Sequence, residues 1–223
     1  MDTGLKAFVI PVTPFQQNCS VHWCTKTNKG AVVDPGGDLD QIDDAIAKHG
    51  IELEKVLVTH GHIDHAGGVA EFAERHNLPI EGPHKDEIFW ISQLAEQGER
   101  FGLAAGRPFE PDRWLDDGDT VTVGDLVYDV VHCPGHTPGH VVFIHRPGVD
   151  RPHRLSQGQS RGPDRLDPGQ AVSPGRRHHL HPRPRRPVDL RPGTPVQPLR
   201  RGQPVRVSGD ACFLVLATIR NIS

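Results

Sequence analysis

Four side chains that can bind a metal ion stand close together in this sequence. The segment from His60 to His65 reads HGHIDH, with three imidazoles and one carboxylate. Neutral imidazole nitrogen and carboxylate oxygen are the usual ligands of zinc and of similar divalent ions. In an extended backbone alternate side chains share a face, so His60 and His62 can point at one ion. A helix from Ala66 would place Asp64 and His65 at its start, facing a second ion. The segment therefore predicts a metal site.

The predicted strands and helices place this segment at the end of a strand. Lys55 to Thr59 reads as a buried strand and Ala66 to His76 as a helix. Another helix is predicted from Leu39 up to Gly50, with Asp38 as its cap. Strands are also predicted at 7–12, 20–25, 31–33, 79–80, 120–123, 126–132 and 141–144, and a further helix at 83–106. Because strands and helices interleave, the sequence favours an α/β fold with helices outside the sheets.

A second histidine-bearing segment lies between two predicted strands. Residues 133–140 read CPGHTPGH, and such glycine and proline residues preset a tight loop that loses little entropy on binding an ion. His136 is the natural third ligand beside His60 and His62. His140 is either another ligand or a support for a ligand or the adjoining strand, and the supporting role is favoured.

Together the two segments resemble the metallo-β-lactamase superfamily, and most closely its short glyoxalase II-like members, the hydroxyacylglutathione hydrolases. Three further stretches look like that branch, namely TPFQQNC at 13–19, DPGG at 34–37 and DRWL at 112–115. The resemblance runs from about residue 6 to residue 144. It implies a metallo-β-lactamase-type αββα sandwich with two metal ions at the edge of its sheets, incomplete here in its C-terminal half.

The resemblance also implies a role for each motif residue. His60, His62 and His136 would hold a first ion, while Asp64, the predicted catalytic residue, and His65 would hold a second. Zinc is the expected metal, with iron and manganese as alternatives. An activated water would then attack a thioester or ester carbonyl, since a bound divalent ion lowers the pKa of its water to about 7 and polarises carbonyl oxygen.

The composition changes abruptly near residue 145. Residues 1–145 hold 10 Lys+Arg and 23 Asp+Glu, a net charge of −13, whereas residues 146–210 hold 14 Arg, no Lys and 5 Asp, a net charge of +9. The second stretch also has 12 Pro and no aromatic residue. We predict that residues 1–145 are the N-terminal part of the domain. Residues 146–223 are predicted to be an aberrant Arg/Pro-rich tail, disordered or poorly packed, because few apolar groups offset the ordering entropy.

Two ligands that the resemblance requires are missing where they are expected. One is an Asp that bridges both ions soon after the His136 loop, and the other is a His late in the chain. A shifted reading frame in a GC-rich gene accounts for this, because plausible codons for residues 166–193, advanced by one nucleotide, encode Gly-His-Gly across residues 183–185. Asp210, in Ser-Gly-Asp, looks like the bridging ligand but stands far too late. Asp34 either orients a ligand or simply forms a turn before Pro-Gly.

The predicted function is metal-dependent hydrolysis of a small-molecule thioester, with a glutathione-linked substrate implied by the resemblance and activity impaired by the missing ligands. One alternative is an iron-dependent enzyme like the persulfide dioxygenases. Another is an inactive, truncated or frame-shifted metal-binding domain. A specific nucleic-acid partner is disfavoured, because the basic residues 146–210 include neither an aromatic stacking residue nor a recognisable binding motif.

The cysteines and the apolar runs bear on the cellular compartment. Cys19, Cys24, Cys133 and Cys212 form no CxxC pair, and the N-terminal residues do not read as a signal peptide. We therefore predict free thiols in the reducing cytoplasm. No apolar run approaches the length of a membrane span, so no membrane partner is expected.

Overall fold

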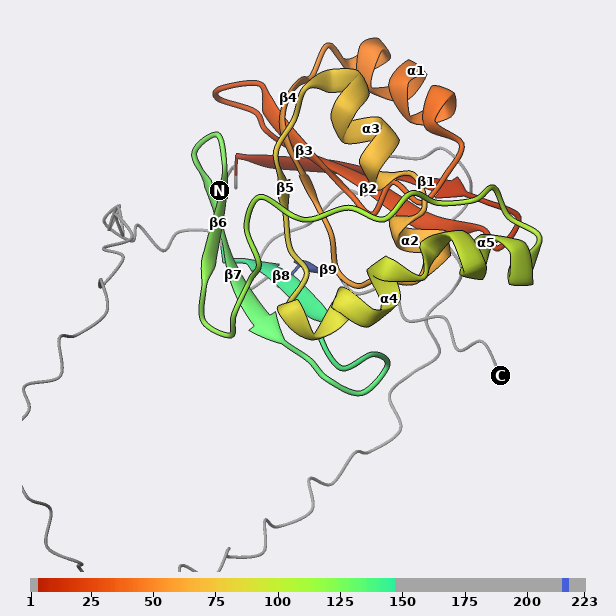
Figure 1. Ribbon diagram of the computed structural model, residues 1–223. Coiled ribbons are helices and arrows are strands. Elements are labelled where there is room, and N and C mark those ends of the chain that lie inside the picture. The colour runs from red at the N-terminus through yellow and green to blue at the C-terminus, as the bar shows by residue number, and fades with distance from the viewer. Residues whose placement is uncertain (1–3, 147–213, 217–223) are drawn as a thin grey trace, which may run out of the picture. The chain divides into compact units, whose positions relative to one another are not determined.

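The computed structural model describes residues 4–146 and 214–216, which form two β-sheets with helices (Figure 1). The first sheet has the strand order β1 (Leu5–Val12), β2 (Gln17–Cys24), β3 (Lys29–Val33), β4 (Glu52–Leu57) and β5 (Ile80–Glu81). The second has the order β6 (Thr120–Val123), β7 (Leu126–His132), β8 (Val141–His145) and β9 (Leu214–Leu216). Neighbouring strands are antiparallel except for the pairs β3–β4 and β4–β5, which are parallel.

The first sheet is buried on both faces. Val32 and Val56 pack against the helices, whereas Ala31, Val33 and Leu57 belong to the core between the sheets. Successive side chains of a strand point to opposite faces, so an uninterrupted apolar run supplies both layers at once. These runs are the reason that short segments of the sequence predicted buried strands correctly.

Two helices cover the outer face of the first sheet, α1 (Leu39–His49) and α3 (Val69–His76) (Figure 1). Their buried side chains recur at helical spacing and are Leu39, Ile42, Ile46, Val69, Ala70, Phe72 and Ala73. The predicted α/β class with helices outside the sheets is confirmed. The described residues thus form a helix layer and two sheets, and a second helix layer is not among them.

The helix predicted from Ala66 to His76 begins later, as α3, and a separate short helix, α2 (Ile63–Ala66), precedes it. Gly67 and Gly68 separate them, and glycine is a poor helix former. A Cβ added at Gly68 would lie 2.5 Å from the carbonyl oxygen of Pro35, so the chain passes close to the turn after β3.

Two further expectations differ from the structure. The predicted helix at 83–106 is split into η1 (Lys85–Glu87), α4 (Ile88–Ser92) and α5 (Leu94–Phe101), and α5 ends at Gly102 in the left-handed conformation. Asp38 occupies the N-cap position of α1, as predicted, but its side chain makes no capping hydrogen bond. Its carboxylate instead accepts a hydrogen bond from the backbone N–H of Thr13 at 2.7 Å and so binds the turn after β1.

Three remaining predictions concern the cysteines, the C-terminal segment and a membrane span. Cys19, Cys24 and Cys133 are free thiols, as predicted, and Cys212 lies outside the described residues. The same is true of Asp210 and of most of the Arg/Pro-rich segment, although β9 pairs with β8. None of the helices in the described ranges has the length and hydropathy that a bilayer span requires.

Candidate metal centre

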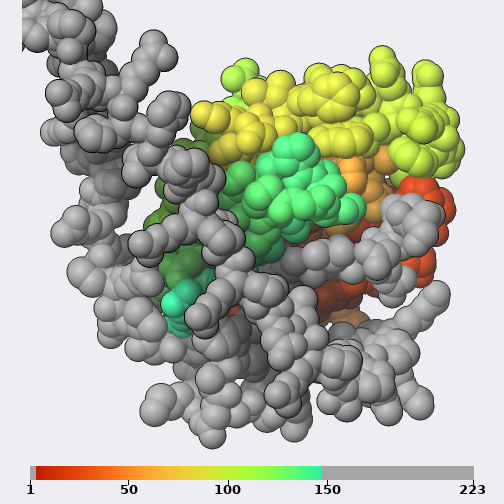
Figure 2. All heavy atoms as spheres, turned by 90° about the horizontal axis from the view of Figure 1, so that it is seen from below, coloured from red at the N-terminus to blue at the C-terminus, as the bar shows by residue number. Residues whose placement is uncertain are grey.

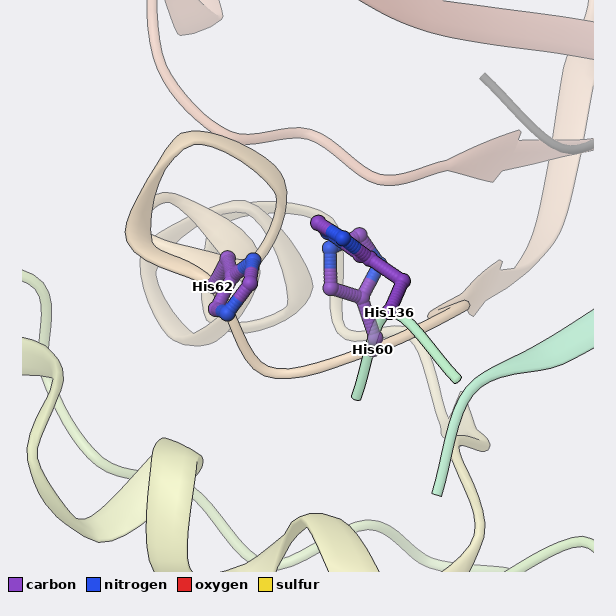
Figure 3. A group of neighbouring side chains, drawn as sticks. All are labelled: His60, His62 and His136. Atoms are coloured by element: carbon purple, nitrogen blue, oxygen red, sulfur yellow. The ribbon is translucent and has the colours of Figure 1, made fainter. Parts of the chain in front are cut away.

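Two loops from different sheets bring His60, His62 and His136 together (Figure 3). One ligand nitrogen of each residue lies within 4.8 Å of those of the other two. The ring centroids are 4.9 Å apart for His60–His62 and His60–His136 and 4.7 Å apart for His62–His136. All three pairs are nearly perpendicular, at 75° to 87°, so the rings face one another edge-on instead of stacking. The structure therefore assembles the predicted histidine trio.

Backbone hydrogen bonds join these loops at the base of the site. The N–H of Val141, at the start of β8, donates to the carbonyl of Thr59 at 3.0 Å and links the two sheets. The N–H of Cys133 donates to the carbonyl of His140 at 2.8 Å and closes the second loop. The loops are thus positioned by the ends of the two sheets.

A chain of hydrogen bonds orients His60. The backbone N–H and the hydroxyl of Thr59 donate to the two oxygens of Asp34, at 2.7 and 2.6 Å. Since the hydroxyl proton is used in this way, the hydroxyl accepts from Nδ1–H of His60 at 2.9 Å. The proton is then on Nδ1, and Nε2 keeps its lone pair for an ion.

Asp64 and His65 lie next to this trio, on α2. His65 Nδ1 donates to Asp34 Oδ2 at 2.9 Å, which leaves Nε2 free, and that nitrogen is 3.6 Å from Asp64 Oδ2. Ligand atoms of Asp34, His60 and His65 also lie within 4.8 Å of one another. Both roles that the sequence left open for Asp34 are therefore present. It occupies a turn, at φ 53°, and its hydrogen bonds orient residues that are predicted ligands.

Burial decides the protonation of the clustered histidines. Burial, followed by the neighbouring imidazoles, lowers the pKa of His60 well below its usual value and that of His62 to about 4. The pKa of His140 is also lowered, chiefly by burial. For His65 burial acts in the same direction, but the hydrogen bond and charge of Asp34 outweigh it and raise the pKa. His60 and His62 are thus neutral at pH 7, the form that binds metal ions.

His140 is buried beside the trio without belonging to it. Its ring centroid is 5.0 Å from that of His60 and 6.1 Å from that of His136. It is absent from the groups of converging ligand atoms found within the described part of the chain. This arrangement agrees with the supporting role that the sequence favoured.

Two buried polar residues of the site were missed by sequence reasoning. The amide of Gln97 holds the first loop, accepting from Ile63 N–H at 3.0 Å and donating to the Gly61 carbonyl at 3.3 Å. The carboxylate of Glu87 is fully buried and accepts from backbone N–H groups of both loops. Nothing local in the polar run KDE distinguishes Glu87 from Asp86, so no sequence signal was available.

A third group of potential ligands, His84, Asp86 and His132, lies outside the trio. The two imidazoles are stacked, with centroids 4.3 Å apart and planes inclined by 19°. Lone pairs of imidazole lie in the ring plane, so nearly parallel rings do not converge on one ion. His132 Nε2 instead donates to the carbonyl of Pro138 at 2.8 Å and supports the second loop.

The donor set of the trio fits a divalent ion. Nε2 of His60 is buried and has no hydrogen-bond partner within the described residues, although an unpaired buried polar atom costs about 1–3 kcal/mol. An ion at this nitrogen would remove that cost. Three histidines that leave a fourth position open are one of the known ligand sets of catalytic zinc.

Comparison with known proteins agrees with these motifs. The sequence profile described as "Metallo-beta-lactamase superfamily" matches residues 12–148. The chain is 39% identical over 137 residues to hydroxyacylglutathione hydrolase GloC of Haemophilus influenzae, covering 61% of this chain and 64% of that protein. It is 34% identical over 125 residues to a hydroxyacylglutathione hydrolase of Halorhodospira halophila, covering 55% and 41%. The matched segment thus spans less than two thirds of either relative.

Two solved structures share the fold. The BLEG-1 B3 metallo-beta-lactamase superposes with a TM-score of 0.56 and 26% identity, covering 62% of this chain and 66% of that one. TTHA1623, in a di-iron-bound form, gives a TM-score of 0.53 and 29% identity, covering 61% and 65%. The predicted metallo-β-lactamase-type fold and the glyoxalase II-like resemblance are confirmed.

Proposed function

The chain belongs to the metallo-β-lactamase superfamily, and on that premise we propose that it is a metal-dependent hydrolase of the glyoxalase II type. The observation that carries this proposal is the convergence of His60, His62 and His136, with a buried and unpaired nitrogen on His60. The relatives named hydroxyacylglutathione hydrolases support the reaction class. The expected substrate is a small thioester linked to glutathione. The cytoplasmic location remains a prediction.

The proposal assigns a task to each side chain of the site. His60, His62 and His136 would hold one ion, and Asp64 and His65 would contribute to a second. A divalent ion supplies an activated water at neutral pH and polarises a substrate carbonyl. Asp34 keeps protons on the outward nitrogens of the ligand rings, directly at His65 and through a hydroxyl at His60.

Zinc fits this centre because His60 and His62 are neutral at pH 7 and nitrogen is a favoured zinc donor. Iron is the alternative that a relative supports, since TTHA1623 was solved in a di-iron-bound form. Manganese remains an alternative from the sequence. The metal content of the purified chain decides among the three.

We further propose that the second half of the centre is incomplete. The bridging Asp and the late His are absent from the positions where the resemblance requires them. The described residues offer only Asp64 and His65 next to Asp34 on that side. Because each lost ligand weakens binding, one tightly held ion per chain and little hydrolysis are expected.

Metal analysis and a thioesterase assay test both proposals on the full chain. The expected result is about one zinc ion per chain, lost in His60→Ala, and slow turnover of S-lactoylglutathione. Two tightly held ions with rapid turnover would show that the centre is complete. Absence of any bound metal would overturn the hydrolase proposal. Oxygen consumption with persulfide by iron-loaded protein would instead favour the dioxygenase alternative. Translation of the coding DNA in all frames after codon 140 tests the shifted reading frame.

A further inference from the structure

Glu87 joins the two loops that carry the three histidines. Its Oε2 accepts a hydrogen bond from the backbone N–H of Gly61 at 2.8 Å, and its Oε1 accepts one from that of Gly139 at 2.7 Å. Gly61 lies between His60 and His62, and Gly139 follows His136 in the second loop. One carboxylate thus spans the boundary between the two ligand sources.

The carboxylate is deeply buried and has only backbone groups to stabilise its charge. Glu87 is 0% exposed, and within the described ranges no Lys, Arg or His forms an ion pair with it. Burying a carboxylate is costly unless it is paired or hydrogen-bonded, and hydrogen bonds to an ionised group are roughly twice as strong as neutral ones. Keeping a carboxylate in the core costs free energy. We attribute its presence to the two loops that it holds together.

Both contacts require glycine as the donor. A Cβ added at Gly139 would lie 2.8 Å from Cγ and 2.9 Å from N of Glu87. One added at Gly61 would lie 2.7 Å from Cβ of Trp90, on the helix that follows Glu87. The space-filling view shows the corresponding close packing, with the yellow segment of η1 and α4 directly against the teal second loop (Figure 2).

The residue that begins the η1 turn, His84, also holds the second loop. The N–H of His84 donates to the carbonyl of Gly139 at 3.2 Å, so Gly139 is bound through its carbonyl as well as through its N–H. Gln97 holds the first loop but makes no hydrogen bond to the second. Within the described chain, Glu87 is therefore the side chain that bonds both loops.

We propose that Glu87 is a positioning residue that sets the distance between His136 and the pair His60–His62, and thereby the affinity of the centre for its ion. The inference rests on the proposed metal centre. His60 and His62 belong to one loop and His136 belongs to the other. Metal binding therefore depends on the distance between the two loops. Glu87 touches neither ligand rings nor substrate in this role.

The test is the zinc affinity of Glu87→Gln, measured by competition with a chromophoric chelator on the full chain. Glutamine has the same size, but it can accept only one of the two N–H groups and turns an amide N–H₂ towards the other. Zinc binding is expected to weaken about 10- to 100-fold, as for other residues that support metal ligands. In cobalt-substituted protein the visible absorption of a tetrahedral site is expected to fall.

Glu54→Gln is the matched control. Glu54 Oε2 also accepts from a glycine N–H, that of Gly124 at 2.9 Å, and so also joins β4 to a turn of the second sheet. This contact lies at the β6–β7 turn, whereas the histidine loop follows the other end of β7. Glu54→Gln is expected to bind zinc as the wild type does. Gly139→Ala, which separates the loops without removing the charge, is expected to resemble Glu87→Gln.

Each outcome decides the inference. Equal zinc affinity of Glu87→Gln and wild type overturns it, and so does an equal loss in Glu54→Gln, because general destabilisation would then explain the effect. If Glu87→Gln does not fold, Gly139→Ala decides in the same way by its zinc affinity. A wild type that binds no zinc overturns the metal centre itself, which distinguishes that failure from the failure of Glu87 alone.

Discussion

Asp34 Oδ2 lies 2.9 Å from His65 Nδ1, and this contact joins the turn after β3 to the helix that carries two predicted ligands. The same oxygen accepts the hydroxyl of Thr59 at 2.6 Å, and that hydroxyl in turn accepts from His60. One carboxylate oxygen thus fixes the ring tautomers on both sides of the centre.

Asp34→Asn is expected to weaken zinc binding about 10- to 100-fold, because an amide cannot accept all of these hydrogen bonds. Titration with a chromophoric chelator measures the change. Asp40→Asn, on an exposed carboxylate of α1, is the control and should retain wild-type affinity. An Asp34→Asn protein that binds zinc like the wild type would contradict the orienting role.

Thr59→Val removes the hydroxyl between Asp34 and His60 at nearly constant volume. The buried Nδ1–H of His60 then loses its acceptor, so we expect unfolding to require about 1–3 kcal/mol less free energy. Urea denaturation of metal-free protein measures this. Thr59→Ser keeps the hydroxyl and is expected to recover most of the loss; equal midpoints for Thr59→Val and wild type would refute the hydrogen-bond chain.

His136→Ala and His140→Ala should separate the ligand from its neighbour. His136 converges with His60 and His62, whereas His140 lies outside that group. We expect His136→Ala to lose stoichiometric zinc, as measured by elemental analysis after dialysis, and to lose the rise in melting temperature that zinc gives the wild type. His140→Ala is expected to keep a bound ion, and its complete loss there would make His140 a ligand.

His22 predicts how stability depends on pH. Burial between the sheets, followed by the neighbouring His145, lowers its pKa to about 3. In the unfolded chain the imidazole of His22 binds a proton near pH 6.5, whereas in the folded chain it stays neutral down to about pH 3. The stability of the fold is therefore fully present above pH 6.5 and falls as the pH drops towards 3. At pH 4 the loss from this residue is about 3 kcal/mol.

The comparison of wild type with His22→Gln isolates that effect. Both proteins are denatured with urea at pH 7, 5.5 and 4 in the presence of a chelator, so that other histidines contribute equally. The wild type is expected to lose stability more steeply than the variant over this range. Parallel curves for the two proteins would mean that His22 does not contribute this dependence.

The sequence by itself predicted the candidate ligands and the strands that lead to them. HGHIDH and the histidine of CPGHTPGH could be read because their meaning depends on spacing within a few residues. Apolar runs such as 55–59 predicted buried strands for the same reason, although β4 begins and ends earlier than expected, at Glu52 and Leu57. Helix lengths were less predictable, since Gly67 and Gly68 break a helix only where a neighbouring turn comes close.

The tertiary structure alone decided how the ligands are held. Asp34 meets Thr59 across 25 residues of sequence, and Glu87 meets Gly61 across 26 and Gly139 across 52. No local pattern marks such contacts, because a carboxylate has the same sequence context whether it faces water or a backbone amide. Candidate metal-binding residues can be recognised in short sequence motifs. The groups that orient them depend instead on which loops the two sheets bring together.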